Sequence, residues 1–183
     1  MTSLRRIAVI LNPAARSTKA ASMVDVVRSL PSRITPEIHF TAHTGHASLL
    51  AENLAADGVD IVVAVGGDGT VNEVLQGICR VNAKRPDSTT HCILGTLPAG
   101  TMNVFSYELG YHSHTDIVTP WDFIQAGSTA EIDLWMANDQ YFLQLAGVGV
   151  DAEIVKLTSW EQKRRLGPLS YVMSALRVLR KNL

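Results

Sequence analysis

The stretch 61–74, IVVAVGGDGTVNEV, sets the interpretation of the whole 183-residue chain. Ile61 to Val65 is a short apolar, β-branched run, typical of a strand buried on both faces of a parallel sheet. From Val71 onward, apolar residues recur at i, i+3, i+4 and i+7, which is the pattern of one helix face. Three glycines and one aspartate therefore lie in a tight turn between a strand and a helix.

Such a turn is suited to binding phosphate. Glycines lack Cβ atoms, so the backbone can pass close to a ligand, and the following helix N-terminus favours anions. Asp68 would repel a bare phosphate, so we expect it to act through a bridging Mg²⁺ or to take a proton during phosphoryl transfer. A plainer interpretation is a glycine-rich turn with Asp68 or Thr70 as N-cap, since Thr70-x-x-Glu73 fits a capping box. The pattern as a whole favours the phosphate site.

The chain before this loop alternates strands with helices. Ile7 to Leu11 and Glu37 to Thr41 are predicted strands, and 18–30 and 47–55 carry helical stripes. This alternation predicts an α/β fold with a parallel sheet flanked by helices, and ligands at the carboxyl ends of the strands. The loops that follow these two strands and the strand Ile61 to Val65 should therefore meet in one crevice. They are Asn12 to Ser17, Thr41 to His46 and Gly66 to Thr70.

After residue 90 the pattern continues and then changes. We predict a strand over Cys92 to Leu97 and a short helix over Trp121 to Gly127. Glu131 to Met136 and Tyr141 to Ala146 instead indicate a β-hairpin. We therefore predict a nucleotide-binding α/β domain over residues 1–128 and an incomplete β-rich domain over 129–183.

Composition excludes some classes of protein. The 16 basic and 17 acidic residues argue against a general nucleic-acid binder. Cys79 and Cys92 lack metal-ligand spacing and are expected to be free thiols. The apolar run 7–11 is too short for a signal peptide, and the uncharged stretch 88–107 contains glycine and proline. We expect a soluble, cytoplasmic protein.

The segment 66–74, GGDGTVNEV, resembles the signature of the diacylglycerol kinase catalytic-domain family, which includes sphingosine kinases and bacterial lipid kinases. The Gly-Gly-Asp-Gly core also occurs in NAD kinases and 6-phosphofructokinases. Asn72-Glu73 and a second glycine motif favour the lipid-kinase branch. That second motif, PAGTMN at 98–103, resembles Pro-Leu-Gly-Thr-Gly-Asn, with Ala99 and Met102 as departures.

Two further segments resemble family motifs that face the nucleotide. They are Asn12-Pro13, which would otherwise be an ordinary turn, and Thr44-Gly45-His46-Ala47, in which His46 is expected to cap or pack its helix. The resemblance thus assigns a set of nucleotide-binding positions: Asn12, Thr44, Gly66, Gly67, Asp68, Gly69, Thr70, Glu73, Gly100, Thr101 and Asn103. Glu73 is expected either to contact the nucleotide or only to close its capping box.

The segment 147–153, GVGVDAE, resembles the start of the family's second domain. The resemblance makes Asp151 a candidate to hold the acceptor hydroxyl, and an equal alternative is that it caps a helix starting near Ala152. Arg164 or Arg165 is a candidate to steady transferred phosphate, or to belong to a solvated face, or to attract anionic lipid headgroups. The helical stripe over 169–179 is expected to be core.

The resemblance implies an ATP- and Mg²⁺-dependent lipid kinase, with Asp68 and Asp151 as catalytic residues and diacylglycerol or a sphingoid-type alcohol as substrate. It also implies contact with lipid at a membrane surface, as a peripheral protein of the inner face. The alternatives are an NAD kinase-like enzyme and a truncated, inactive ATP-binding module. Family members continue beyond the part that corresponds to residue 183, and their continuation carries an Asp-Gly-Glu motif. This chain could be a fragment, a short natural form, or a part completed by another chain, and the sequence leaves these alternatives open. Unpaired strands of the incomplete domain predict self-association as a homo-oligomer.

Overall fold

The computed structural model of the protein describes residues 5–13, 25, 27–28, 35–111, 117–158, 162 and 169–181. The chain divides into two compact units, Met1–Leu143 and Gln144–Leu183. The helix predicted over 18–30 falls largely outside the described residues, as do Arg164 and Arg165.

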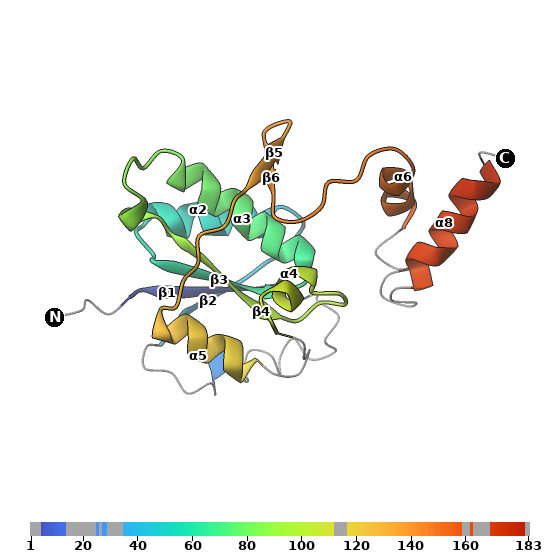
Figure 1. Ribbon diagram of the computed structural model, residues 1–183. Helices are drawn as coiled ribbons and strands as arrows, with labels where there is room; N and C mark the ends of the chain where they lie inside the picture. Colours follow the sequence, from blue (N-terminus) through green and yellow to red (C-terminus); the bar gives the residue numbers. More distant parts are fainter. Residues whose placement is uncertain are drawn as a thin grey trace. The chain divides into compact units, whose positions relative to one another are not determined.

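The first unit contains a four-stranded sheet in which every strand pairing is parallel (Figure 1). The strand order is β2-β1-β3-β4, with β2 at Glu37–Phe40, β1 at Ile7–Leu11, β3 at Ile61–Gly66 and β4 at Ile93–Pro98. Every residue of β1 and β3 is buried, as expected for central strands covered on both faces. The predicted parallel sheet is confirmed.

Helices α2 (His46–Ala56) and α3 (Asp68–Asn82) cover one face of the sheet (Figure 1). They lie close together at Gly77, where an added Cβ would overlap the carbonyl oxygen of Ser48. Helix α5 (Val118–Ala126) covers the other face through Trp121, whose side chain is fully buried. The unit also contains two short elements, the 3₁₀ turn η1 (Ser88–Thr90) and α4 (Val104–Glu108).

The β-hairpin is present but shorter than predicted, with β5 at Trp135–Ala137 and β6 at Gln140–Phe142. Its two-residue turn, Asn138-Asp139, has φ values of 47° and 62°, which match the type I′ turn that suits strand twist. The hairpin packs against α3, so it belongs to the first compact unit, whose limit at Leu143 lies beyond the predicted boundary near residue 128. The predicted boundary between the family's two domains, near residue 128, stays a prediction.

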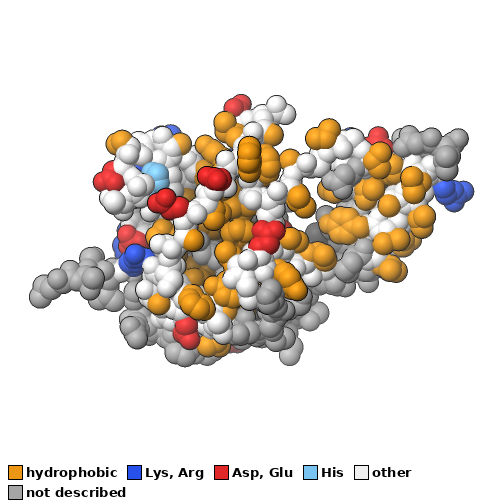
Figure 2. All heavy atoms as spheres, viewed as in Figure 1, with side chains coloured by type: hydrophobic (Ala, Val, Ile, Leu, Met, Phe, Trp, Pro, Cys, Tyr) orange, Lys and Arg blue, Asp and Glu red, His pale blue; other side chains and the backbone are white. Residues whose placement is uncertain are grey.

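The second unit contains α6 (Val150–Leu157) and α8 (Leu169–Lys181). The two helices pack through small polar side chains, and Thr158 Oγ1 lies 2.8 Å from the hydroxyl of the fully buried Ser174. The apolar stripe of α8 was predicted to be buried in a core. This prediction is wrong for the second unit, in which the stripe is exposed. Figure 2 shows hydrophobic side chains gathered over this helix, and Leu169, Val172, Met173, Leu176 and Leu179 are exposed.

Among the described residues, no helix is both long enough and apolar enough to cross a membrane.

Candidate functional site

Three loops leave the sheet at the same edge. The register pairs Leu11 with Val65 and Gly66 with Pro98, so β1, β3 and β4 end level with one another. Backbone hydrogen bonds carry this alignment into the loops: the Asn12 N–H donates to Val65 O at 3.1 Å, and the Ala99 N–H donates to Gly66 O at 3.0 Å. The strand ends thus bring together the three segments that the glycine motifs and Asn12-Pro13 had marked.

The first loop is tied to the start of α3 by side chains. Asn12 Nδ2 donates to Thr70 Oγ1 at 3.1 Å, and Thr70 is only 6% exposed. Gly66 is needed beneath this contact, because a Cβ there would lie 2.5 Å from the same hydroxyl oxygen. The Asn12 and Thr70 side chains therefore help to hold the loops in place.

The two glycine motifs touch each other through their backbones. A Cβ added at Gly100 would overlap Gly67 Cα, and one added at Gly67 would lie 3.2 Å from Gly100 Cα. By contrast, nothing lies within 4 Å of a Cβ added at Gly69, which is exposed. Gly67 and Gly100 thus permit close contact between the loops, whereas the loop is open at Gly69.

Asn103 organises the second glycine loop from within. Its backbone is left-handed, with φ 50°, a conformation that asparagine tolerates better than most residues. The side-chain Oδ1 accepts from the Gly100 N–H at 2.8 Å, and Nδ2 donates to Gly100 O at 3.1 Å. Asn103 is 4% exposed, so these contacts are made away from water. Its neighbour Thr101 is partly buried, and Met102 is exposed.

Asp68 is the first residue of α3, with Gly67 as the N-cap. A carboxylate at this position is stabilised by the helix dipole. Its Oδ1 accepts from the Phe105 N–H at 3.3 Å, which links it to the first turn of α4. Asp68 is partly buried, so its charge lies at the rim of the loops.

The capping box predicted from Thr70 and Glu73 is wrong. The helix begins two residues before Thr70, and its N-cap makes no side-chain hydrogen bond. Glu73 instead reaches the neighbouring helix, where its Oε2 accepts from the Ala47 N–H at 3.2 Å. Glu73 therefore satisfies a donor in the first turn of α2.

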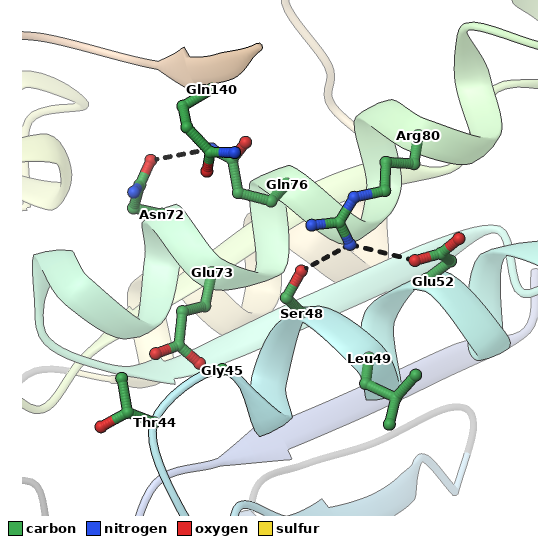
Figure 3. A pocket seen from close by; sticks show the side chains of 10 residues that line it. All are labelled: Thr44, Gly45, Ser48, Leu49, Glu52, Asn72, Glu73, Gln76, Arg80 and Gln140. Atoms are coloured by element: carbon green, nitrogen blue, oxygen red, sulfur yellow. Dashed lines mark hydrogen bonds and ion pairs between the residues drawn. The ribbon is translucent and has the colours of Figure 1, made fainter. Parts of the chain in front are cut away.

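An open pocket of about 370 Å³ lies along α2 and α3 (Figure 3). Thr44 and Glu73, both predicted nucleotide contacts, line one part of it. In another part, Arg80 bonds to Ser48 Oγ at 2.9 Å and to Glu52 Oε2 at 3.0 Å. The full lining is Thr44, Gly45, Ser48, Leu49, Glu52, Asn72, Glu73, Gln76, Arg80 and Gln140.

Most of this lining was missed from the sequence. The signal that was available is a polar stripe on α3, in which Asn72, Glu73, Gln76 and Arg80 share one helix face at the spacing of three or four residues. The pocket overlaps the predicted site at Thr44 and Glu73, whereas the glycine loops are not part of its lining.

The remaining predicted residues lie in the second part of the chain. The backbone of Asp151 is in α6, but the helix starts at Val150 with Gly149 as N-cap, so the alternative that Asp151 caps it is wrong. Asp151 belongs to the second unit, and the role of its carboxylate in holding a hydroxyl stays a prediction.

Both cysteines are free thiols, as predicted. Burial raises the pKa of Cys79 to about 11 and that of Cys92 to about 12.

Within the described ranges, no three His, Cys, Asp or Glu side chains gather as a ready-made metal site. Asp68, the one residue predicted to interact with a metal, lies at the glycine loops.

Comparisons with known proteins agree with this geometry. A family model described as the diacylglycerol kinase catalytic domain matches residues 6–137. A diacylglycerol kinase of Staphylococcus carnosus (strain TM300) is 29% identical over 177 residues, covering 96% of this chain and 55% of the relative. A diacylglycerol kinase of Staphylococcus aureus (strain JH9) is 34% identical over 139 residues, covering 76% of this chain and 41% of the relative.

Solved structures give the same result. A crystal structure of a diacylglycerol kinase from Bacillus anthracis str. Sterne is 26% identical, with a TM-score of 0.68, and the match covers 97% of this chain and 56% of that one. A second crystal structure from that organism gives a TM-score of 0.70 at 26% identity, over 99% and 56% of the two chains. The chain spans about half the length of the curated relatives it matches. It belongs to the diacylglycerol kinase catalytic-domain family.

Proposed function

We propose that the protein binds ATP with Mg²⁺ where the three loops meet, and that it is the nucleotide-binding part of a lipid kinase. The observation that carries the proposal is the backbone contact between Gly67 and Gly100, which joins the two glycine motifs into one cradle. A phosphate chain needs such a surface, because side chains would keep it away from backbone N–H groups.

The start of α3 supplies the anion-binding end of the cradle. The N–H groups of Thr70 and Val71 both donate to Gly67 O, at 2.9 and 3.1 Å. The amides of Asp68 and Gly69 lie at the tip of the 15-residue helix, where helix geometry provides no acceptor for them. These two amides are our candidates to bind the nucleotide phosphates.

Asp68 fits the role of a carboxylate that acts on a nucleotide-bound metal. Mg²⁺ is commonly held by one or two carboxylates together with substrate phosphates, so a full protein cage is not required. When bound, the ion would neutralise charge on the phosphates during transfer. Thr44 and Glu73 are proposed to contact the nucleotide from the pocket along α2 and α3. Asn12, Gly66, Thr70, Gly100, Thr101 and Asn103 are proposed to form or support the cradle.

The proposed reaction moves the γ-phosphoryl group of ATP to a lipid hydroxyl. A bond forms between the hydroxyl oxygen and the γ-phosphorus, and the bond from that phosphorus to the β–γ bridging oxygen breaks. The hydroxyl proton passes to a base, and Asp68 is our candidate for this base in the alternative in which it does not hold the metal. Asp151 is proposed to hold the hydroxyl, and Arg164 or Arg165 to steady the phosphate. In-line transfer depends mainly on positioning and charge neutralisation, which suits a site of amides and few acids.

The relatives named diacylglycerol kinase support a lipid acceptor, which we propose is diacylglycerol or a sphingoid-type alcohol. The protein would meet this substrate as a peripheral protein at the inner membrane face. An NAD kinase-like enzyme shares the Gly-Gly-Asp-Gly core, and an ATP-binding module without activity is the other alternative.

Radiolabelled ATP tests these alternatives together. The purified chain is incubated with Mg²⁺ and diacylglycerol, sphingosine or NAD, with the Staphylococcus carnosus relative run in parallel, and products are separated by thin-layer chromatography. Label in a lipid supports the proposal and identifies the acceptor, whereas label in NAD contradicts it. If calorimetry detects ATP binding but no acceptor is labelled above the level seen with Asp68→Ala, the chain is an ATP-binding module.

A further inference from the structure

The backbone of the hairpin is held by one side chain of α3. Gln76 Nε2 donates to Tyr141 O at 2.6 Å, and Gln76 Oε1 accepts from the Tyr141 N–H at 3.0 Å. Gln76 Nε2 also lies 3.3 Å from Asn72 Oδ1. Gln76 is 6% exposed, so both ends of its amide are used away from water, where an unmade hydrogen bond is costly.

The hairpin's own geometry explains why Tyr141 is the residue held. In an antiparallel ladder, pairs that exchange hydrogen bonds alternate with pairs whose N–H and C=O groups point outward. Tyr141 pairs with Met136 and is of the second kind, because both of its groups bond to Gln76. The side-chain amide therefore takes the place of a third strand along β6.

The large apolar side chains of β5 are mostly exposed, whereas Tyr141 and Phe142 of β6 are partly buried. Trp135 is 65% exposed and Met136 is 60% exposed, and Leu143, just after β6, is partly buried against the core beneath α3. The two hydrogen bonds from Gln76 therefore act together with these partial apolar contacts to hold the hairpin on α3.

The docked hairpin is also part of the pocket wall. Gln140, next to Tyr141, lines the pocket together with Asn72, Glu73 and Gln76 of α3 (Figure 3). If the hairpin leaves α3, Gln140 leaves the pocket with it. A ligand that contacts this wall therefore binds the docked state better than the undocked one.

We propose that Gln76 is a positioning residue, which docks the β5–β6 hairpin as a wall of the pocket and so couples hairpin docking to nucleotide binding. The identity of the occupant rests on the proposed function. Coupling of this kind is reciprocal, so the nucleotide should stabilise the docked hairpin by the same factor by which docking strengthens nucleotide binding.

We call the two hydrogen bonds between the Gln76 side chain and the Tyr141 backbone the clasp. Gln76→Glu tests it with almost no change in the shape of the side chain. At neutral pH the carboxylate still accepts from the Tyr141 N–H, but it has no donor for Tyr141 O and sets a negative charge against that oxygen. We expect the amide-exchange protection factor of Tyr141, measured by NMR on the full chain, to fall by about tenfold or more, equivalent to one hydrogen bond. Lowering the pH should restore protection, because a protonated carboxyl can donate again.

Gln140→Glu is the matched control. It adds the same charge to the pocket wall but leaves the clasp intact, since the only hydrogen bond described for this side chain runs to Asp139 O. Tyr141 protection should stay near the wild-type value. Equal Tyr141 protection in wild type, Gln76→Glu and Gln76→Ala at pH 7 would overturn the clasp.

The coupling is tested by calorimetry with ATP and Mg²⁺. Gln76→Glu should weaken ATP binding, and ATP should raise Tyr141 protection in the wild type. Tyr141→Pro breaks the clasp from the hairpin, because proline has no N–H to donate to Gln76 Oε1. It should also weaken ATP binding, and it leaves α3 unchanged if substitutions in that helix impair folding. Unchanged ATP affinity with a lost clasp would overturn the coupling. Absence of ATP binding in the wild type would overturn the proposed function as well, while amide exchange would still decide the clasp.

Discussion

Gly67 and Gly100 are in contact through their backbones, although they belong to loops that follow different strands. Each position is constrained by the other, because a methyl group on Gly100 would overlap Gly67 Cα. This contact fixes the distance between the start of α3 and the loop that leads to α4, and hence the width of the cradle.

Gly100→Ala should separate the two loops. The overlap is with backbone, which cannot move aside as a flexible side chain can, so we expect the free energy of unfolding to fall by about 1–3 kcal/mol, as in overpacked sites. Urea unfolding measures this change. Gly69→Ala is the control, since its Cβ would have open space, and its stability should stay the same or rise by up to about 1 kcal/mol in a helical position. Equal losses in the two variants would show that the loop contact is not the cause.

Asp68→Asn should remove the negative charge of this side chain while keeping its hydrogen bond from the Phe105 N–H. The amide oxygen can still accept from the Phe105 N–H, so the free energy of unfolding should change by less than about 1 kcal/mol. Loss of the carboxylate should weaken ATP binding in the presence of Mg²⁺ by about tenfold or more, because a carboxylate bound to the ion is removed. Calorimetry with and without Mg²⁺ measures the effect. If wild type, Asp68→Asn and Asp68→Ala bind equally well, Asp68 has no metal or phosphate role.

The two thiols predict a pH dependence of stability. Burial raises the pKa of Cys79 to about 11 and that of Cys92 to about 12, from 9.0. Between pH 9 and these values the unfolded chain loses thiol protons that the folded chain keeps, so stability falls as pH rises. The slope of unfolding free energy against pH above 9 should be steeper in the wild type than in a Cys79→Ser, Cys92→Ser variant. Identical slopes would contradict the raised values.

The hairpin should promote self-association. Gln76 covers the outer side of β6, whereas β5 has no described strand partner on its other side and exposes Trp135 and Met136. We expect a concentration-dependent shift on a sizing column for the wild-type chain. Met136→Lys should shift the equilibrium toward monomer, because a charge on an edge strand opposes pairing. A wild-type monomer at all concentrations would contradict this prediction.

Local patterns were enough to predict the parallel sheet and the meeting of the loops that begin at Asn12 and Gly66. The apolar runs of β1 and β3 identify buried strands, and the helical spacing after Val71 identifies α3, because each signal lies within a few consecutive residues. Parallel strands then place their carboxyl ends at one edge, which brings Asn12, Gly66 and Pro98 together without further information.

The contacts of Glu73 and Gln76 could not be predicted in this way. Each side chain bonds to a backbone group distant in sequence, Ala47 and Tyr141 respectively, so the spacing within α3 carries no information about the partner. The capping box failed because the helix starts at Asp68, which places Thr70 inside the first turn. The apolar stripe of α8 indicated burial, but helix periodicity alone does not say whether a partner covers it.

The central position of β1 also means that one of its two neighbours is synthesised much later than the other. Among the four strands of this sheet, β1 is synthesised first; β2 is its neighbour on one side, and β3 at Ile61–Gly66 is its neighbour on the other. Until residue 66 has emerged, five fully apolar residues keep one edge of their strand unpaired. Such a nascent chain is prone to aggregation and is a natural target for chaperones. The arrival of β3 closes that edge, and only then does the glycine loop take its place beside Asn12.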